Sequence, residues 1–170
     1  MKIKRENLMN MYSVFQRLAG RETSVRFHYL LLKNRRLIEP EVESIEKASV
    51  PPKSIEAFEE ARIKLCESYC EKDDNGNPKQ RMVQRDPNGP PQSQFVMVPE
   101  TKEEFENLIE ELKEEHKEAL DQFEAKQKEV KDLLEAEVEI TLHTIKLSEM
   151  PKELSGLDID AMFDIIEDDS

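Results

Sequence analysis

The chain has 170 residues, of which 37% are charged and 37% hydrophobic, and its formal net charge is −13. This acidity disfavours direct nucleic-acid binding, because phosphate contacts need a basic surface. No run approaches the roughly 20 apolar residues of a membrane-spanning helix, so no membrane role is expected. The length fits a single domain over residues 1–170. A hydrophobic content below the roughly 45–50% of average globular proteins predicts a thin core.

The N-terminus and the cysteines predict the compartment. Residues 1–12, MKIKRENLMNMY, are basic but lack the continuous apolar segment of a signal peptide. The only two cysteines are Cys66 and Cys70, and such sparing use of cysteine is typical of a reducing environment. We therefore expect a cytoplasmic protein that is not secreted.

Helical periodicity dominates the first 70 residues. It predicts helices over residues 5–19, 24–48 and 53–70. Gly20 is a suitable stop for the first helix, and Thr23 or Ser24 can cap the second. Pro40 lies within the second helix, which is therefore expected either to kink there or to restart with Pro40 at its first position.

Two Asn-Gly pairs mark the middle of the chain. They lie in DDNGNP (73–78) and DPNGPP (86–91), and this pair favours tight turns. Short strand-like segments lie at 81–84 and 94–98. We therefore expect a β-hairpin or an ordered pair of loops within residues 73–99, between two helical halves.

The second half opens with a long acidic helix, expected over residues 102–136, because Thr101 precedes acids that complement the helix dipole. Apolar and polar residues then alternate over 138–147, which predicts a strand. The phase of the alternation slips near Thr144, as at a β-bulge.

A final short helix is expected over residues 158–167, with Ser155 or Asp158 as its cap. Together these elements predict a mostly α fold (α+β). It is a helical bundle or antiparallel helical hairpin with one long acidic helix and a small hairpin or short antiparallel sheet.

The long helix carries an apolar seam. Its members are spaced 4-3-4-3-4, which is a heptad pattern: Phe105, Ile109, Leu112, His116, Ala119 and Phe123. The pattern falters after Phe123, where the next slot is Lys126, and such an interval locally unwinds a supercoil. A seam this short favours antiparallel packing against the helices of the first half, and a coiled-coil homo-oligomer stays the alternative.

No residue pattern indicates a metal, a cofactor or a catalytic site. Cys66 and Cys70 share a helical face, but a zinc site needs about four ligands and no histidine lies at ligand spacing. Residues 71–76 resemble the start of a calcium loop, yet Met82 stands where a bidentate glutamate is required. We therefore expect buried thiols, an ordinary turn, and a protein that is not an enzyme.

His116 has two readings. It lies on the apolar seam among carboxylates, where a histidine could titrate near neutral pH and act as a switch. A tolerated polar residue in a wet part of the packing is the plainer interpretation, and we prefer it.

Two surfaces are candidates for partner binding. One is the acidic face of the long helix: Glu110, Glu111, Glu114, Glu118 and Asp121. It is either a solvated face that keeps the protein soluble or an imitation of nucleic acid. The other is the closing segment LDIDAMFDIIEDD, with Met162, Phe163 and Ile166, which either docks on the core or binds the groove of a partner.

The order of three segments resembles a known class of proteins. They are MKIKRENLMNMY, FEEARIKLCESYCEKDDNGNP and KEVKDLLEAEVEITLHTIKLSEMP. The chain resembles small bacteriophage-encoded proteins of unknown function with a "YxEKDxNG" turn, a long acidic helix and a closing strand. It departs from them at Pro51-Pro52 and in the DPNGPP insertion.

The resemblance implies a phage context and supplies no catalytic residues. We accordingly expect a non-enzymatic protein of the host cytoplasm or the virion, with a protein partner that is self, phage or host. It would serve virion assembly or host takeover through protein–protein contact. The alternative is an acidic DNA-mimic inhibitor of a host nucleic-acid-binding or defence protein.

Overall fold

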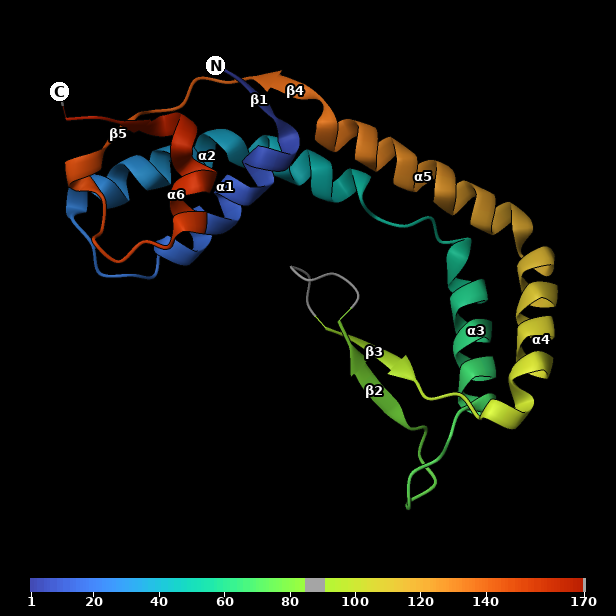
Figure 1. Cartoon of the computed structure of the whole chain (residues 1–170). Helices are drawn as coiled ribbons and strands as arrows, with labels where there is room; N and C mark the ends of the chain where they lie inside the picture. The colour runs from blue at the N-terminus through green and yellow to red at the C-terminus, as the bar shows by residue number, and fades with distance from the viewer. Residues whose placement is uncertain (85–90, 170) are drawn as a thin grey trace. The chain divides into compact units, whose positions relative to one another are not determined.

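A computed structural model describes residues 1–84 and 91–169 of the chain (Figure 1). The fold is mostly helical with short strand pairs, which confirms the predicted fold class. The helices are α1 (Arg5–Leu18), α2 (Val25–Ala48), α3 (Ile55–Tyr69), α4 (Lys102–Glu115), α5 (Lys117–Glu135) and α6 (Gly156–Met162). The strands are β1 (Lys2–Lys4), β2 (Gln80–Val83), β3 (Gln92–Phe95), β4 (Glu137–Glu139), β5 (Ile145–Lys146) and β6 (Ile166–Glu167).

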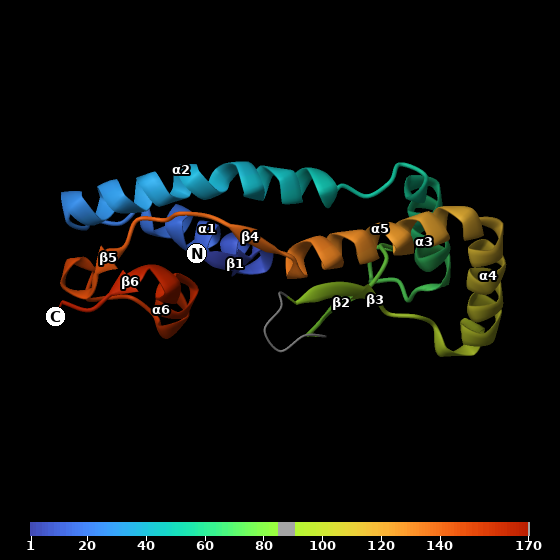
Figure 2. The same ribbon diagram turned by 90° about the horizontal axis from the view of Figure 1, so that it is seen from above.

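The contacts of the chain gather in two compact units, and the single domain over residues 1–170 stays a prediction. Unit 1 is Met1–Val50 with Gln127–Ser170, and unit 2 is Pro51–Lys126. In unit 1, α1 packs against both α2 and α6 and so lies between them (Figure 2). The largest fully buried side chains of this unit are Phe15, Phe27, Leu8, Met11, Leu18, Leu31, Ile38, Ile45, Ile145, Met162, Ile165 and Val42.

The start of α2 is fixed by side-chain hydrogen bonds. Ser24 caps the helix by accepting a hydrogen bond from the Phe27 amide at 3.2 Å. Of the two predicted caps, Thr23 and Ser24, the actual cap is therefore Ser24. Both ring nitrogens of His28 have partners, the Thr23 hydroxyl at 2.7 Å and the Ala19 carbonyl at 3.1 Å. These contacts hold the connection between α1 and α2.

The structure shows where the proline and the glycine of this region lie relative to their helices. Helix α2 runs without interruption from Val25 to Ala48, so of the two alternatives for Pro40 the restart is excluded. Helix α1 ends at Leu18 with right-handed Ala19 as its cap, so Gly20 follows the cap directly, where the sequence placed the stop. Gly20 has no positive φ, so this stop does not use the left-handed conformation that favours glycine.

The predicted strand over 138–147 is two short strands. Strand β4 pairs antiparallel with β1, and β5 pairs in parallel with β6. Between them the buried side chain of Asn34 donates a hydrogen bond to the His143 carbonyl and accepts one from the His143 amide, both at 2.7 Å. A side-chain amide thus stands in for a neighbouring strand.

The closing segment also differs from its prediction over 158–167. Helix α6 begins at Gly156. Ser155 is its cap, and Asp158, the third residue of the helix, completes a capping box with Ser155. The helix ends at Met162, a 3₁₀ turn follows over Phe163–Ile165, and Ile166 is already in β6. Pairing with β5 therefore replaces the last expected helical turn.

Unit 2 contains the antiparallel helical hairpin that the seam predicted. Helices α3 and α4 pack together, with Tyr69 near Phe105 and Phe58 near His116. The ring centroids of these pairs are 6.0 and 5.9 Å apart.

The expected single helix over 102–136 is interrupted at His116, whose φ and ψ are −105° and 20°. The His116 amide still bonds the Leu112 carbonyl, and its carbonyl accepts from the Leu120 amide. The interruption is therefore one residue long and lies upstream of the irregularity that the sequence placed after Phe123.

The β-hairpin prediction is confirmed in unit 2. Strands β2 and β3 pair antiparallel with Gln80 opposite Phe95, a shift of one to three residues from the expected segments 81–84 and 94–98. The turn at 73–78 is built on Asp73, whose carboxylate accepts from the amides of Asn75 and Asn77, and Gly76 has φ 81°. The DPNGPP segment lies outside the described residues except for Pro91.

Candidate interaction surfaces

A groove of about 560 Å³ runs between α1 and α6 in unit 1. One side of the groove is formed by α1 and carries the polar side chains of Asn7, Asn10 and Ser13. The opposite wall carries Leu157 and Phe163, which are 80% and 70% exposed. Exposed apolar side chains that lie together beside a groove are candidates for contact with another molecule.

Charge in the groove is uneven. The guanidinium of Arg17, which lines the groove, donates a hydrogen bond to the buried carboxylate of Asp158. Its charge is therefore already paired. Asp160 and Asp164 also line the groove, and within the described residues neither makes an ion pair. The groove therefore combines exposed apolar side chains with uncompensated carboxylates.

Asp158 holds the groove wall in place. Burial by itself would raise the pKa of this carboxyl, but hydrogen bonds from Ser155 and Arg17 outweigh burial and lower it. The Ser155 hydroxyl lies 2.8 Å and its amide 3.0 Å from the carboxylate. Asp158 thus stays ionised at neutral pH and joins α6 to α1.

The three closing residues predicted to bind a partner have different environments. Met162 is fully buried in the core of unit 1, so the segment is docked and Met162 cannot contact a partner in this conformation. Ile166 is half-buried in β6. Phe163 remains exposed at the groove.

Leu157 was missed as a groove residue. The sequence contained a signal for it: the buried stripe of the segment includes Met162, and Leu157 is an apolar residue that does not fall on this stripe. An apolar residue on the solvent side of an amphipathic helix is a candidate for contact with another molecule.

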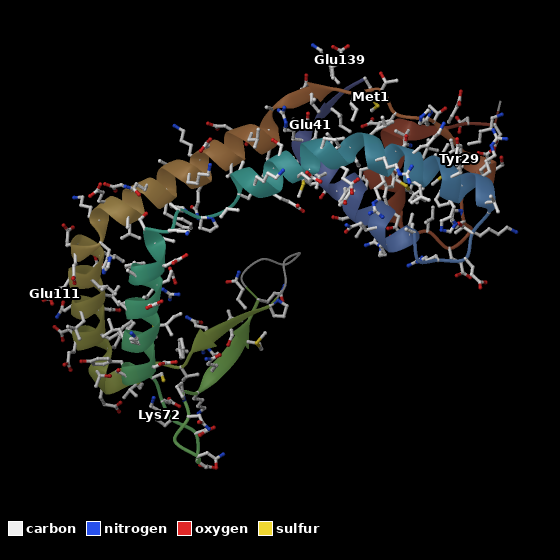
Figure 3. All side chains as sticks on the ribbon, turned by 180° about the vertical axis from the view of Figure 1, so that it is seen from behind. Met1, Tyr29, Glu41, Lys72, Glu111 and Glu139 are labelled. Carbon is white, nitrogen blue, oxygen red and sulfur yellow. The ribbon has the colours of Figure 1, made fainter. Side chains whose placement is uncertain are left out.

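The predicted acidic face is exposed in unit 2. Glu110, Glu111, Glu114, Glu118 and Asp121 are all accessible to solvent, and Figure 3 shows Glu111 on the side of α4 turned away from α3. The helix interruption at His116 divides this row into two parts, and Lys113 pairs with Glu110 at 2.6 Å. The carboxylates of this face are therefore carried by two helical segments, α4 and α5.

The cysteines and histidines do not gather into a site. Cys66 and Cys70 are free and buried, as expected, and burial raises the pKa of the Cys66 thiol. Among residues 1–84 and 91–169, no group of three or more His, Cys, Asp or Glu side chains could hold a metal ion. In the same residues no helix is long and apolar enough to cross a membrane.

Comparison with known proteins does not add a family. No protein-family model, no curated protein and no solved structure matches the chain.

Proposed function

We propose that this chain is a phage-encoded, non-enzymatic protein that acts through protein–protein contact, as a virion-assembly or host-takeover factor. The observation that carries the proposal is the groove between α1 and α6, where Leu157 and Phe163 are 80% and 70% exposed. Exposed aromatic and aliphatic anchors beside a groove are typical of protein interfaces. The phage context rests on the resemblance of the three sequence segments.

The contact can be tested by site-specific photo-crosslinking in a bacterial host. A photoreactive phenylalanine analogue at position 163 is expected to crosslink to a discrete protein, whereas the same analogue at Leu147, which is 51% exposed and does not line the groove, is not. The captured protein is then purified and its affinity measured.

Leu157→Asp with Phe163→Asp should weaken that affinity at least tenfold, while Leu147→Asp should leave it within twofold. The two apolar side chains supply the buried area of the contact, and carboxylates there would lose it. Equal crosslinking at both positions, or equal affinity of both variants, would refute the proposed contact.

The acidic-inhibitor alternative has less support, because the exposed carboxylates lie on two helical segments separated by His116. It predicts a basic, nucleic-acid-binding host protein captured at low salt and released at high salt. Capture that depends on Glu111 and Glu118 rather than on Phe163 would favour this alternative.

A further inference from the structure

Helix α2 has an exposed apolar stripe on the side opposite to its core face. Phe27, Leu31 and Ile38 are fully buried, whereas Val25 and Tyr29 are 87% and 57% exposed. Leu32, which is 41% exposed, continues the stripe with 4-3 spacing, the spacing of helix–helix packing. Figure 3 labels Tyr29 on this helix.

The same part of α2 is basic although the whole chain is acidic. Residues 25–38 contain four Lys or Arg and no acid. Lys33 lies over the Tyr29 ring at 4.8 Å, and Arg36 occupies the next position of the stripe. Within the described part of the chain, neither cation has a carboxylate at ion-pair distance.

This stripe and the α1–α6 groove are complementary in both polarity and charge. The stripe offers Val25 and Tyr29 beside unpaired cations, and the groove offers Leu157 and Phe163 beside the unpaired carboxylates of Asp160 and Asp164. Both belong to unit 1, but to different helices, α2 and α6, with α1 between them. The stripe of one molecule therefore cannot fill its own groove.

We propose that a second copy of this chain occupies the groove, docking the basic stripe of α2 in a head-to-tail contact. A symmetric α2–α2 dimer is disfavoured, because it would place Lys33 and Arg36 opposite other cations. A head-to-tail contact uses different surfaces on the two molecules, so it leaves one stripe and one groove free and allows further copies to add. This proposal rests on the proposed function and names its partner as self.

The test uses two full-length variants whose surfaces are disabled separately. Val25→Glu with Tyr29→Glu removes the stripe and keeps the groove. Leu157→Asp with Phe163→Asp removes the groove and keeps the stripe. All four positions are exposed, so circular dichroism should be unchanged, and Leu147→Asp serves as the surface control.

Sedimentation velocity and light scattering should find that the wild type and the Leu147→Asp control self-associate as concentration rises to about 500 µM, as expected for a small, weak interface. Association should weaken at least fivefold in 0.5 M salt, since charge steers it. Each disabled variant alone should remain monomeric. An equimolar mixture of the two should form one-to-one dimers and stop there, because the only remaining groove and stripe are on different molecules.

Three results would overturn the proposal: a monomeric wild type at all concentrations, a mixture that stays monomeric, or dimers of one disabled variant alone. The last would reveal a symmetric contact. A monomeric wild type whose Phe163 still crosslinks to another protein would reject self-association and leave the proposed function standing.

Discussion

Unit 1 and unit 2 bury their side chains to different depths. In unit 1, α1 lies between α2 and α6, and side chains such as Phe15, Leu8 and Phe27 are completely buried. In unit 2, α4 has no buried residue and α3 buries only Ile55, Phe58 and Cys66. Composition contributes to the contrast, because hydrophobic residues are more frequent in unit 1 than in unit 2. Packing adds to it. A helix covered on two sides buries more apolar surface than one covered on one side.

The contrast should be clearest when one aromatic side chain is removed from each unit. Phe15→Ala should lower the free energy of unfolding by about 3–5 kcal/mol, because a fully enclosed site cannot collapse around the cavity. Phe58→Ala should cost less, since its neighbours on α4 can move inward. Urea unfolding with hydrogen exchange by segment measures both. Equal losses would contradict the comparison.

The buried amide of Asn34 should give the next largest effect. Asn34→Leu leaves the amide and carbonyl of His143 without their partner and should cost about 1–3 kcal/mol, with faster exchange of the His143 amide. Asn10→Leu, at an exposed position of α1, is the control and should change stability little. Unchanged exchange at His143 in the Asn34 variant would show that the side chain does not hold this segment.

Acid should remove the stabilisation that Asp158 gives to unit 1. The folded-state pKa of Asp158 is lowered, so its stabilisation is present above the ordinary carboxyl pKa of about 3.9 and is lost as pH falls through the folded value. The difference in unfolding free energy between wild type and Asp158→Asn should therefore be greatest near pH 7 and shrink below about pH 4. Asp160→Asn is the matched control. A pH-independent difference would mean that charge at Asp158 contributes nothing.

The smallest expected effect is in the turn of unit 2. Gly76 has φ 81°, where a Cβ is strained, so Gly76→Ala should cost about 1 kcal/mol. Gly20→Ala should cost nothing or stabilise slightly, since Gly20 has no positive φ and nothing within 4 Å of an added Cβ. Thermal unfolding of both variants measures this, and equal behaviour would remove the distinction between the two glycines.

Much of the fold could be predicted because it depends on local order. Helical periodicity placed α1, α2 and α3 to within two residues, since an apolar face repeats every three to four residues whatever it packs against. The Asn-Gly turn at 73–78 was predictable because Asp73 and Gly76 act on their immediate neighbours. Phe163 was predicted to bind a partner, which stays a prediction, and the structure leaves its side chain exposed.

The parts of the fold that the sequence did not predict depend on contacts between residues far apart in the chain. Nothing near His143 in sequence indicates that Asn34 will pair with its backbone, and β6 exists because Ile166 meets Ile145. Met162 is buried because α6 docks on α1 through Arg17 and Asp158, two residues that are 141 positions apart in the sequence.

By itself the sequence determined the helical class, the turn chemistry and the placement of acid and base along the chain, because each depends on neighbouring residues. Only the tertiary structure decided which apolar residues remain uncovered. Leu157 and Val25 are exposed and Met162 is enclosed because of how α1, α2 and α6 pack, and a helix cannot specify from its own sequence which of its faces a distant segment will cover.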